Sequence, residues 1–124
     1  VRQQDVAALM SYCRTYGNGA ILALPARDTV KQSQHNPAEP VPYIAQTLAR
    51  SHIWLAQTPQ CFPLSALANA LAVALRSGAD ITDEASAMSL AGHSVGLVKG
   101  HWQNNKLTEP DDWPLVEWVL QQDD

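Results

Sequence analysis

Two cysteines and four histidines are the side chains of this sequence that could support covalent or metal chemistry. Cys13 and Cys61 are the only cysteines among its 124 residues. The pair could form a reactive or metal-binding site, but there is no C-x-x-C motif and no histidine at ligand spacing from either cysteine. We therefore predict a Cys13–Cys61 disulfide, which closes a loop of roughly 50 residues and contributes about 4 kcal/mol in the chain-entropy model. Two free thiols in a reducing compartment would give the same sequence.

The four histidines (His35, His52, His93 and His101) show no spacing typical of a metal site or a catalytic base. His93 and His101 are eight residues apart, so on a helix they would not form the i, i+4 pair of zinc-binding helices. His93 precedes Ser94, but Ser94 lacks the G-x-S-x-G turn of a hydrolase nucleophile. We therefore predict no catalytic residue, no metal site and no cofactor, and we expect that the protein is not an enzyme.

The elements expected to carry these residues are helices. Apolar residues three and four apart, from Val6 through Cys13 to Leu24, predict a first helix that Pro25 ends. The same spacing, with first-turn prolines and Gly78 as a C-terminal cap, predicts further helices over residues 42–55, 64–77 and 82–102, and a short one from residue 110. Thr82 is the expected N-cap of the fourth helix. We find no strand alternation and predict an all-α fold, a single bundle of four to five helices with one disulfide.

Length and composition favour a single helical domain over residues 1–124. Hydrophobic residues make up 46% of the chain, which is enough for a core and argues against disorder. Residues 25–41 are polar and predict a long exposed loop. The net charge of −4 argues against nucleic acid or an anionic membrane as the partner, and no apolar run is long enough to insert into a bilayer.

The C-terminal segment, residues 109–124, is acidic and carries no Lys or Arg. It could be a solvated terminal helix whose tryptophans pack on the body of the protein. The alternative is an anionic, aromatic patch that docks into a basic cleft of a partner, as protein–protein hot spots often do. On the second interpretation the partner-binding residues are Asp111, Asp112, Trp113 and Glu117.

Two segments, each containing a cysteine, have a counterpart in a known family. They are Tyr12-Cys13-Arg14-Thr15-Tyr16-Gly17-Asn18-Gly19-Ala20 and Cys61-Phe62-Pro63-Leu64, the latter followed by an apolar helix and by Thr82-Asp83-Glu84-Ala85. The first resembles the early Cys, Tyr and Gly helix of the periplasmic immunity proteins of the Rap/Tai type, which protect bacteria against type VI secretion effectors. The second resembles that family's Cys-x-Pro half. Together the matched parts cover about half of the chain.

The resemblance implies a small helical periplasmic protein, its leader removed, that binds and occludes a secreted antibacterial toxin. The toxin would be a type VI effector such as a cell-wall amidase, and the immunity protein would catalyse nothing itself. A homodimer is compatible with this reading. The alternative function is a small periplasmic helical chaperone of the acid-stress type, which would expose apolar surface as its carboxylates are protonated.

Overall fold

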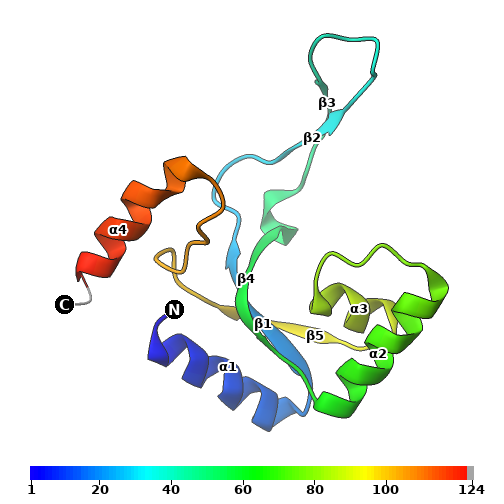
Figure 1. Ribbon diagram of the computed structural model, residues 1–124, viewed down its shortest axis with the longest axis vertical. Coiled ribbons are helices and arrows are strands. Elements are labelled where there is room, and N and C mark those ends of the chain that lie inside the picture. The colour runs from blue at the N-terminus through cyan, green and yellow to red at the C-terminus, as the bar shows by residue number, and fades with distance from the viewer. Residues whose placement is uncertain (123–124) are drawn as a thin grey trace.

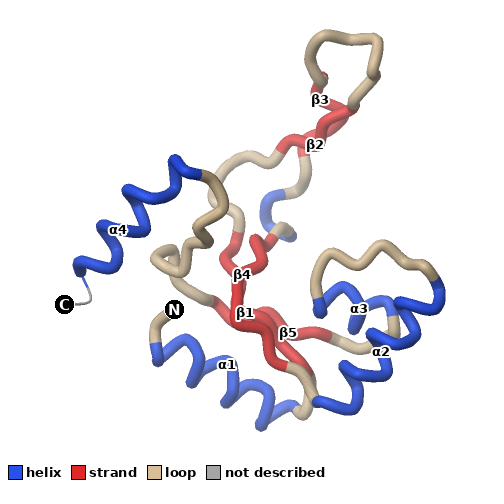
Figure 2. Tube along the Cα trace, viewed as in Figure 1, coloured by secondary structure: helices blue, strands red, loops and turns tan. Residues whose placement is uncertain are grey.

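The protein is a mixed α/β structure, and the computed structural model describes residues 1–122 (Figures 1 and 2). Its elements follow in the order α1 (Gln3–Tyr16), β1 (Gly19–Pro25), β2 (Lys31–Gln34), β3 (Tyr43–Thr47), η1 (Arg50–His52), β4 (Trp54–Cys61), α2 (Leu64–Ser77), α3 (Glu84–Leu90), β5 (Val95–Lys99), η2 (Pro110–Asp112) and α4 (Trp113–Gln122). The predicted all-α bundle is therefore wrong. The single domain over residues 1–124 stays a prediction, and Asp123 and Asp124 of the acidic segment lie outside the described residues.

Strand β1 forms the centre of a three-stranded sheet with the order β4-β1-β5. It pairs antiparallel with β4 and parallel with β5. Ala20, Leu22 and Ala23 of β1 are fully buried, as expected for a continuous apolar run in a central strand. Helix α1 packs on this sheet through Leu9, and a second apolar cluster joins α2 to α3 through Met88 and three buried alanines (Figure 1).

The predicted first helix ends early because two glycines interrupt it. Gly17 has a left-handed φ of 69°, and its N–H donates to the Cys13 carbonyl, which caps α1. Gly19 then starts β1 where the chain passes directly against Phe62, and a Cβ at this position would overlap the Phe62 ring. The apolar residues from Ala20 to Leu24 therefore continue as a strand rather than as helix.

Two of the other predicted helices are also wrong. Residues 42–55 form β3, η1 and the start of β4, and residues 82–102 are helical only in α3 before Gly92, with φ of 87°, turns the chain into β5. The third predicted helix is confirmed as α2, with Gly78 as its left-handed C-cap. The N-cap of α3 is Asp83 rather than Thr82, because the Asp83 carboxylate accepts a hydrogen bond from the Ser86 N–H at 2.8 Å.

The predicted loop over residues 25–41 is partly a β-hairpin arm. Strands β2 and β3 form their own two-stranded antiparallel sheet, and every residue in both strands is exposed. The arm projects beyond the rest of the molecule (Figure 1). A hydrogen bond of 2.9 Å from the Leu48 N–H to the Val30 carbonyl closes its base.

Candidate functional site

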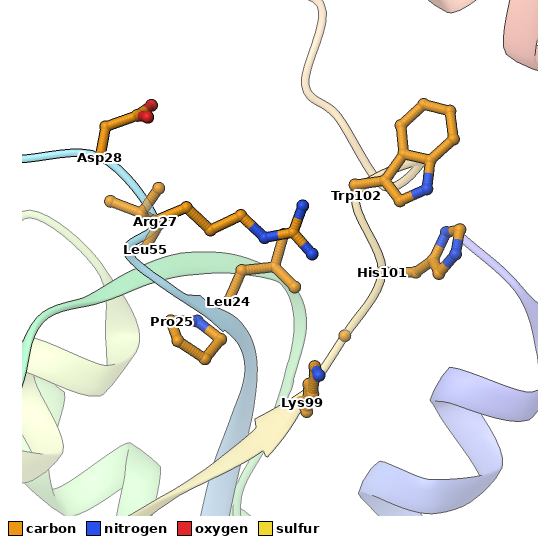
Figure 3. Close-up of a pocket in the computed structure, with 9 residues that line it drawn as sticks. Leu24, Pro25, Arg27, Asp28, Leu55, Lys99, His101 and Trp102 are labelled. Atoms are coloured by element: carbon orange, nitrogen blue, oxygen red, sulfur yellow. The ribbon is translucent and has the colours of Figure 1, made fainter. Parts of the chain in front are cut away.

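A pocket of about 410 Å³ opens where strands β1 and β5 end (Figure 3). Its lining comes from the end of β1 and the residues after it, from β4, and from the end of β5 and the segment that follows: Leu24, Pro25, Arg27, Asp28, Leu55, Lys99, Gly100, His101 and Trp102. Ligands of α/β proteins usually bind at the carboxyl ends of parallel strands, so this is the position where a site is expected.

The parallel pairing of β1 with β5 brings the residues after β1 and the residues after β5 together in this pocket. Ala23 is the partner of Lys99 in the ladder, and the Gly100 N–H donates to the Ala23 carbonyl at 3.0 Å. On the other side, the Ala26 N–H donates to the Ile53 carbonyl at 2.9 Å, next to the start of β4. The residues after both strands therefore leave the sheet at the same edge.

Positive charge dominates the polar lining of the pocket. The Arg27 guanidinium is directed toward the segment that carries Lys99 and His101, whereas the Asp28 carboxylate lies farther from that segment (Figure 3). Within residues 1–122, neither Arg27 nor Lys99 forms a salt bridge. Two cations that form no salt bridge at a concave surface attract an anion, and a guanidinium is well suited to bind phosphate or carboxylate through two hydrogen bonds.

The rest of the lining is apolar and aromatic. Leu24 and Leu55 lie beside the Arg27 side chain (Figure 3). Trp102 stacks on Trp118 of α4 with ring centroids 6.0 Å apart, so the last helix supports one wall of the pocket. A ligand that combines an anionic group with a short carbon skeleton would fit this combination of surfaces.

Gln57 of β4 holds the segment that follows β5. Its side-chain NH₂ donates to the carbonyls of His101 and Asn104 at 3.0 and 3.1 Å. In return, the Asn104 amide donates to the Thr58 carbonyl at 2.6 Å. These three hydrogen bonds attach residues 101–104 to β4 and so fix the backbone that carries His101 and Trp102.

A buried carboxylate on α1 lies near the same segment. Asp5 is 5% exposed and accepts two hydrogen bonds from the Arg2 guanidinium, at 2.7 and 2.8 Å. The Arg2 contact lowers the pKa of Asp5, burial opposes this effect, and the charge of His101 adds to the lowering. Asp5 is therefore an anion at neutral pH and places a negative charge near His101.

The comparisons with known proteins identify the family. The family model for IspD, 2-C-methyl-D-erythritol 4-phosphate cytidylyltransferase, matches residues 1–122. The chain belongs to the IspD family. This membership replaces the resemblance to the Rap/Tai immunity proteins, which is wrong.

Individual members of the IspD family support the same assignment. The cytidylyltransferase of Citrobacter koseri is 43% identical over 120 residues, covering 97% of this chain and 50% of that protein. That of Shewanella amazonensis is 45% identical over 117 residues, covering 94% of this chain and 47% of the relative. The crystal structure of the Francisella tularensis enzyme is 34% identical with a TM-score of 0.84, covering 96% of this chain and 54% of that one. The chain thus spans about half the length of the relatives it matches.

Membership of the IspD family corrects the predicted function. Neither an immunity protein nor an acid-stress chaperone is supported, and a cognate toxin as partner is wrong because the relatives are named for a reaction on small molecules. The expectation that the protein is not an enzyme is also wrong, since the relatives are transferases. The predicted periplasmic location depends on the resemblance to the immunity proteins, and it is wrong because the chain belongs to the IspD family instead.

The described part of the chain contains neither of two other features, a cluster of metal-binding side chains and a membrane-spanning helix. Among residues 1–122, no group of three or more His, Cys, Asp or Glu side chains is placed to hold a metal ion. No helix in the same range is long and apolar enough to cross a bilayer.

The predicted partner-binding residues lie in η2 and in the first half of α4, and none of them lines the pocket. Asp112 accepts hydrogen bonds from the backbone N–H groups of Glu109 and Thr108 at 2.9 and 3.0 Å, and these bonds lower its pKa. Trp113 begins α4 and is half exposed, while Asp111 and Glu117 are exposed. Asp112 thus caps the turn that leads into α4. Binding of a protein partner by these four residues stays a prediction.

Cys13 and Cys61 lie together, as predicted, but the structure describes both as free thiols. The Cys13 thiol donates to the Cys61 carbonyl with a sulfur–oxygen distance of 3.7 Å. Both cysteines line a second pocket that shares no residue with the first. Their disulfide stays a prediction, to which we return below.

The sequence interpretation missed the cations of the site. Arg27 and Lys99 each follow an apolar run, and both runs were assigned to helices instead of strands. His101 was considered only as a zinc ligand or a base. Arg27 and Lys99 each follow a short aliphatic or β-branched segment. If both segments had been interpreted as strands, this shared position would have indicated that the two cations lie at strand ends.

Proposed function

We propose that this chain supplies the acceptor-phosphate site of a 2-C-methyl-D-erythritol 4-phosphate cytidylyltransferase, and that this site is the pocket at the ends of β1 and β5. The observation that supports the proposal is the orientation of Arg27 into a pocket that also presents Lys99 and His101, so that three basic side chains line it against one carboxylate, that of Asp28. The family name supplies the matching ligand, a small polyol that carries one phosphate.

The size and lining of the pocket fit such a ligand. A volume of about 410 Å³ lies within the range of small-molecule sites, roughly 300–1,000 Å³. Arg27 would bind the phosphate through two parallel N–H···O bonds, and Lys99 would add a second positive charge. The side chains of Leu24 and Leu55 offer an apolar surface to the carbon skeleton.

In cytidylyl transfer, one oxygen of the acceptor phosphate attacks the α-phosphorus of cytidine triphosphate. A new P–O bond joins the acceptor to the cytidylyl group, and the bond to the leaving pyrophosphate breaks. Both reactants are anions that repel each other. Cations held against the acceptor phosphate reduce this repulsion and orient the attacking oxygen, which are the two contributions that a protein makes to phosphoryl transfer.

The direct test is a transfer assay on the purified protein with cytidine triphosphate and 2-C-methyl-D-erythritol 4-phosphate. We expect release of pyrophosphate and a product with the mass of the diphosphocytidyl derivative. The unphosphorylated polyol, used as the matched control substrate, should give neither. Absence of pyrophosphate release with the phosphorylated acceptor would refute the proposed activity.

The position of the acceptor site needs a separate measurement. Inorganic phosphate should compete with the phosphorylated acceptor in the wild-type protein, and this competition should weaken in Arg27→Gln. Unchanged competition in Arg27→Gln, in a protein that still transfers the cytidylyl group, would refute the site while leaving the activity in place.

A further inference from the structure

The thiols of Cys13 and Cys61 are the only cysteine side chains of the chain, and the cytidylyltransferase proposal does not use them. Cys13 lies on the buried side of α1, and Cys61 is the last residue of β4, directly opposite Ala20 in the ladder. Both belong to the apolar cluster in which Leu9 packs on β1. The two cysteines are 48 positions apart in the sequence, so their contact depends on the complete α1–β1–β4 arrangement.

The Cys13 side chain contacts Cys61. The Cys13 S–H points at the Cys61 carbonyl, 3.7 Å away. The pKa of the Cys13 thiol is raised, mainly by burial and then by its interaction with the Cys61 thiol. A disulfide requires Cα atoms about 4.4–6.8 Å apart, and a Cys13 sulfur that already reaches the Cys61 backbone is compatible with that requirement.

Solvent and small oxidants can reach the pair. Neither cysteine is fully buried, and both line a pocket of about 240 Å³ together with Met10, Arg14 and Phe62. The Arg14 side chain gives this pocket a positive charge. A small anionic disulfide such as oxidised glutathione is therefore attracted to the place where it must react.

We infer that Cys13 and Cys61 form a reversible redox site, which closes to a disulfide by exchange with an anionic small-molecule disulfide. In the first step, a protein thiolate attacks one sulfur of glutathione disulfide; the S–S bond breaks, one glutathione thiolate leaves, and a mixed disulfide forms. In the second step, the other cysteine attacks the protein sulfur of the mixed disulfide and releases the second glutathione. The protein loses two electrons and two protons, and these appear as two glutathione thiols.

The environment of the pair assigns the order of attack. The Cys13 thiol donates a hydrogen bond to the Cys61 carbonyl, and its pKa is raised by partial burial; both favour the protonated thiol, so Cys13 is a poor first nucleophile. Cys61 therefore carries the mixed disulfide, and Cys13 resolves it. The resulting bond joins helix α1 to the end of β4 and should stabilise the packing of the helix on the sheet.

The test is incubation of the purified native protein with glutathione disulfide, followed by alkylation of free thiols and peptide mapping by mass spectrometry. We expect a Cys13–Cys61 linked peptide, a mass lower by two hydrogen atoms, and full reversal by dithiothreitol. The bridged form should also melt at a higher temperature than the reduced form. Two alkylated cysteines after the incubation, or two glutathiones on one chain without a bridge, would overturn the inference.

Single-cysteine variants test the order of attack. Cys13→Ser should take up one glutathione through Cys61 faster than Cys61→Ser takes it up through Cys13, and neither should show the rise in melting temperature on oxidation. Equal or reversed rates would overturn the assigned order. Because the wild-type mapping requires no substitution, a folding defect in either variant would leave the main test intact.

Discussion

Replacement of Arg27 by glutamine tests whether the pocket at the ends of β1 and β5 recognises a phosphate. The substitution removes the charge and keeps a side chain that can still donate hydrogen bonds. The Arg27 side chain makes no salt bridge within the described residues, so its removal breaks no ion pair there. Any loss of function can therefore be attributed to the ligand rather than to the fold.

The expected magnitude follows from the exposure of the site. Hydrogen bonds to charged groups contribute about 1.5–3 kcal/mol; because Arg27 is exposed to solvent, we reduce this to about 1–2 kcal/mol. This free energy corresponds to a rise in KM for the phosphorylated acceptor of about 5–30-fold. Because the contact is already made to the bound acceptor, kcat should fall by less than KM rises.

The assay is steady-state cytidylyl transfer measured through pyrophosphate release, at low and at high salt. The screening length falls from about 10 Å at 0.1 M salt to about 3 Å at 1 M, so KM of the wild-type protein should rise with salt more steeply than that of Arg27→Gln. Arg76→Gln is the matched control, since Arg76 is an exposed cation in the last turn of α2 and lines neither pocket. A KM for the acceptor that is unchanged in Arg27→Gln, with the same salt dependence as the wild type, would refute the reasoning.

Three further substitutions test the support of the site. Asp5→Asn should lower the free energy of unfolding by about 1–2 kcal/mol at pH 7. Because the pKa of Asp5 is lowered in the fold, the wild-type advantage should be complete above the unfolded pKa of about 4, decrease as the pH falls below it, and disappear once the pH is below the lowered pKa of the folded protein, in urea unfolding measured across pH. Gln57→Leu should reduce hydrogen-exchange protection over residues 101–104, and unaltered protection would contradict the anchoring role of Gln57. Gly19→Ala should cost about 1–3 kcal/mol in the same urea assay, because the added Cβ overlaps Phe62, and a neutral effect would contradict this close packing.

Helices could be predicted from the sequence where their pattern has no competing interpretation. The stripe of leucines and alanines in α2 extends over fourteen residues and ends at Gly78, and a strand of that length would be unusual. The proline at residue 110 likewise marked the start of the C-terminal helical segment. In both cases the local signals for the start, the face and the end of the helix agree.

The sheet could not be predicted in the same way, because its central strand satisfies both periodicities. From Ala20 to Leu24 every residue is apolar, so positions three and four apart match a helix while adjacent positions match a buried strand. The helix prediction extended the genuine pattern of α1 through Gly17 and Gly19. The left-handed φ of Gly17, which decides the question, is a property of the backbone that composition does not reveal.

The predicted family failed for a related reason. The resemblance depended on two cysteines within apolar segments, and their proximity in the fold is real. Proximity of two thiols, however, is compatible with many architectures, since any close packing of a helix on a strand can produce it. The cysteine pair therefore indicated a contact between Cys13 and Cys61 that the fold contains, but it did not indicate the α/β fold class.

The candidate site depends on one pairing that no local pattern contains. Arg27 and Lys99 are far apart in the sequence, and each appears on its own as an exposed cation after an apolar segment, which is a common occurrence on protein surfaces. Once Ala23 is paired in parallel with Lys99, both segments must end at the same edge of the sheet. Parallel neighbours present their carboxyl ends together, so the two cations converge there without any further requirement. The site is thus a consequence of strand direction, and an interpretation that assigned β1 to a helix could not have located it.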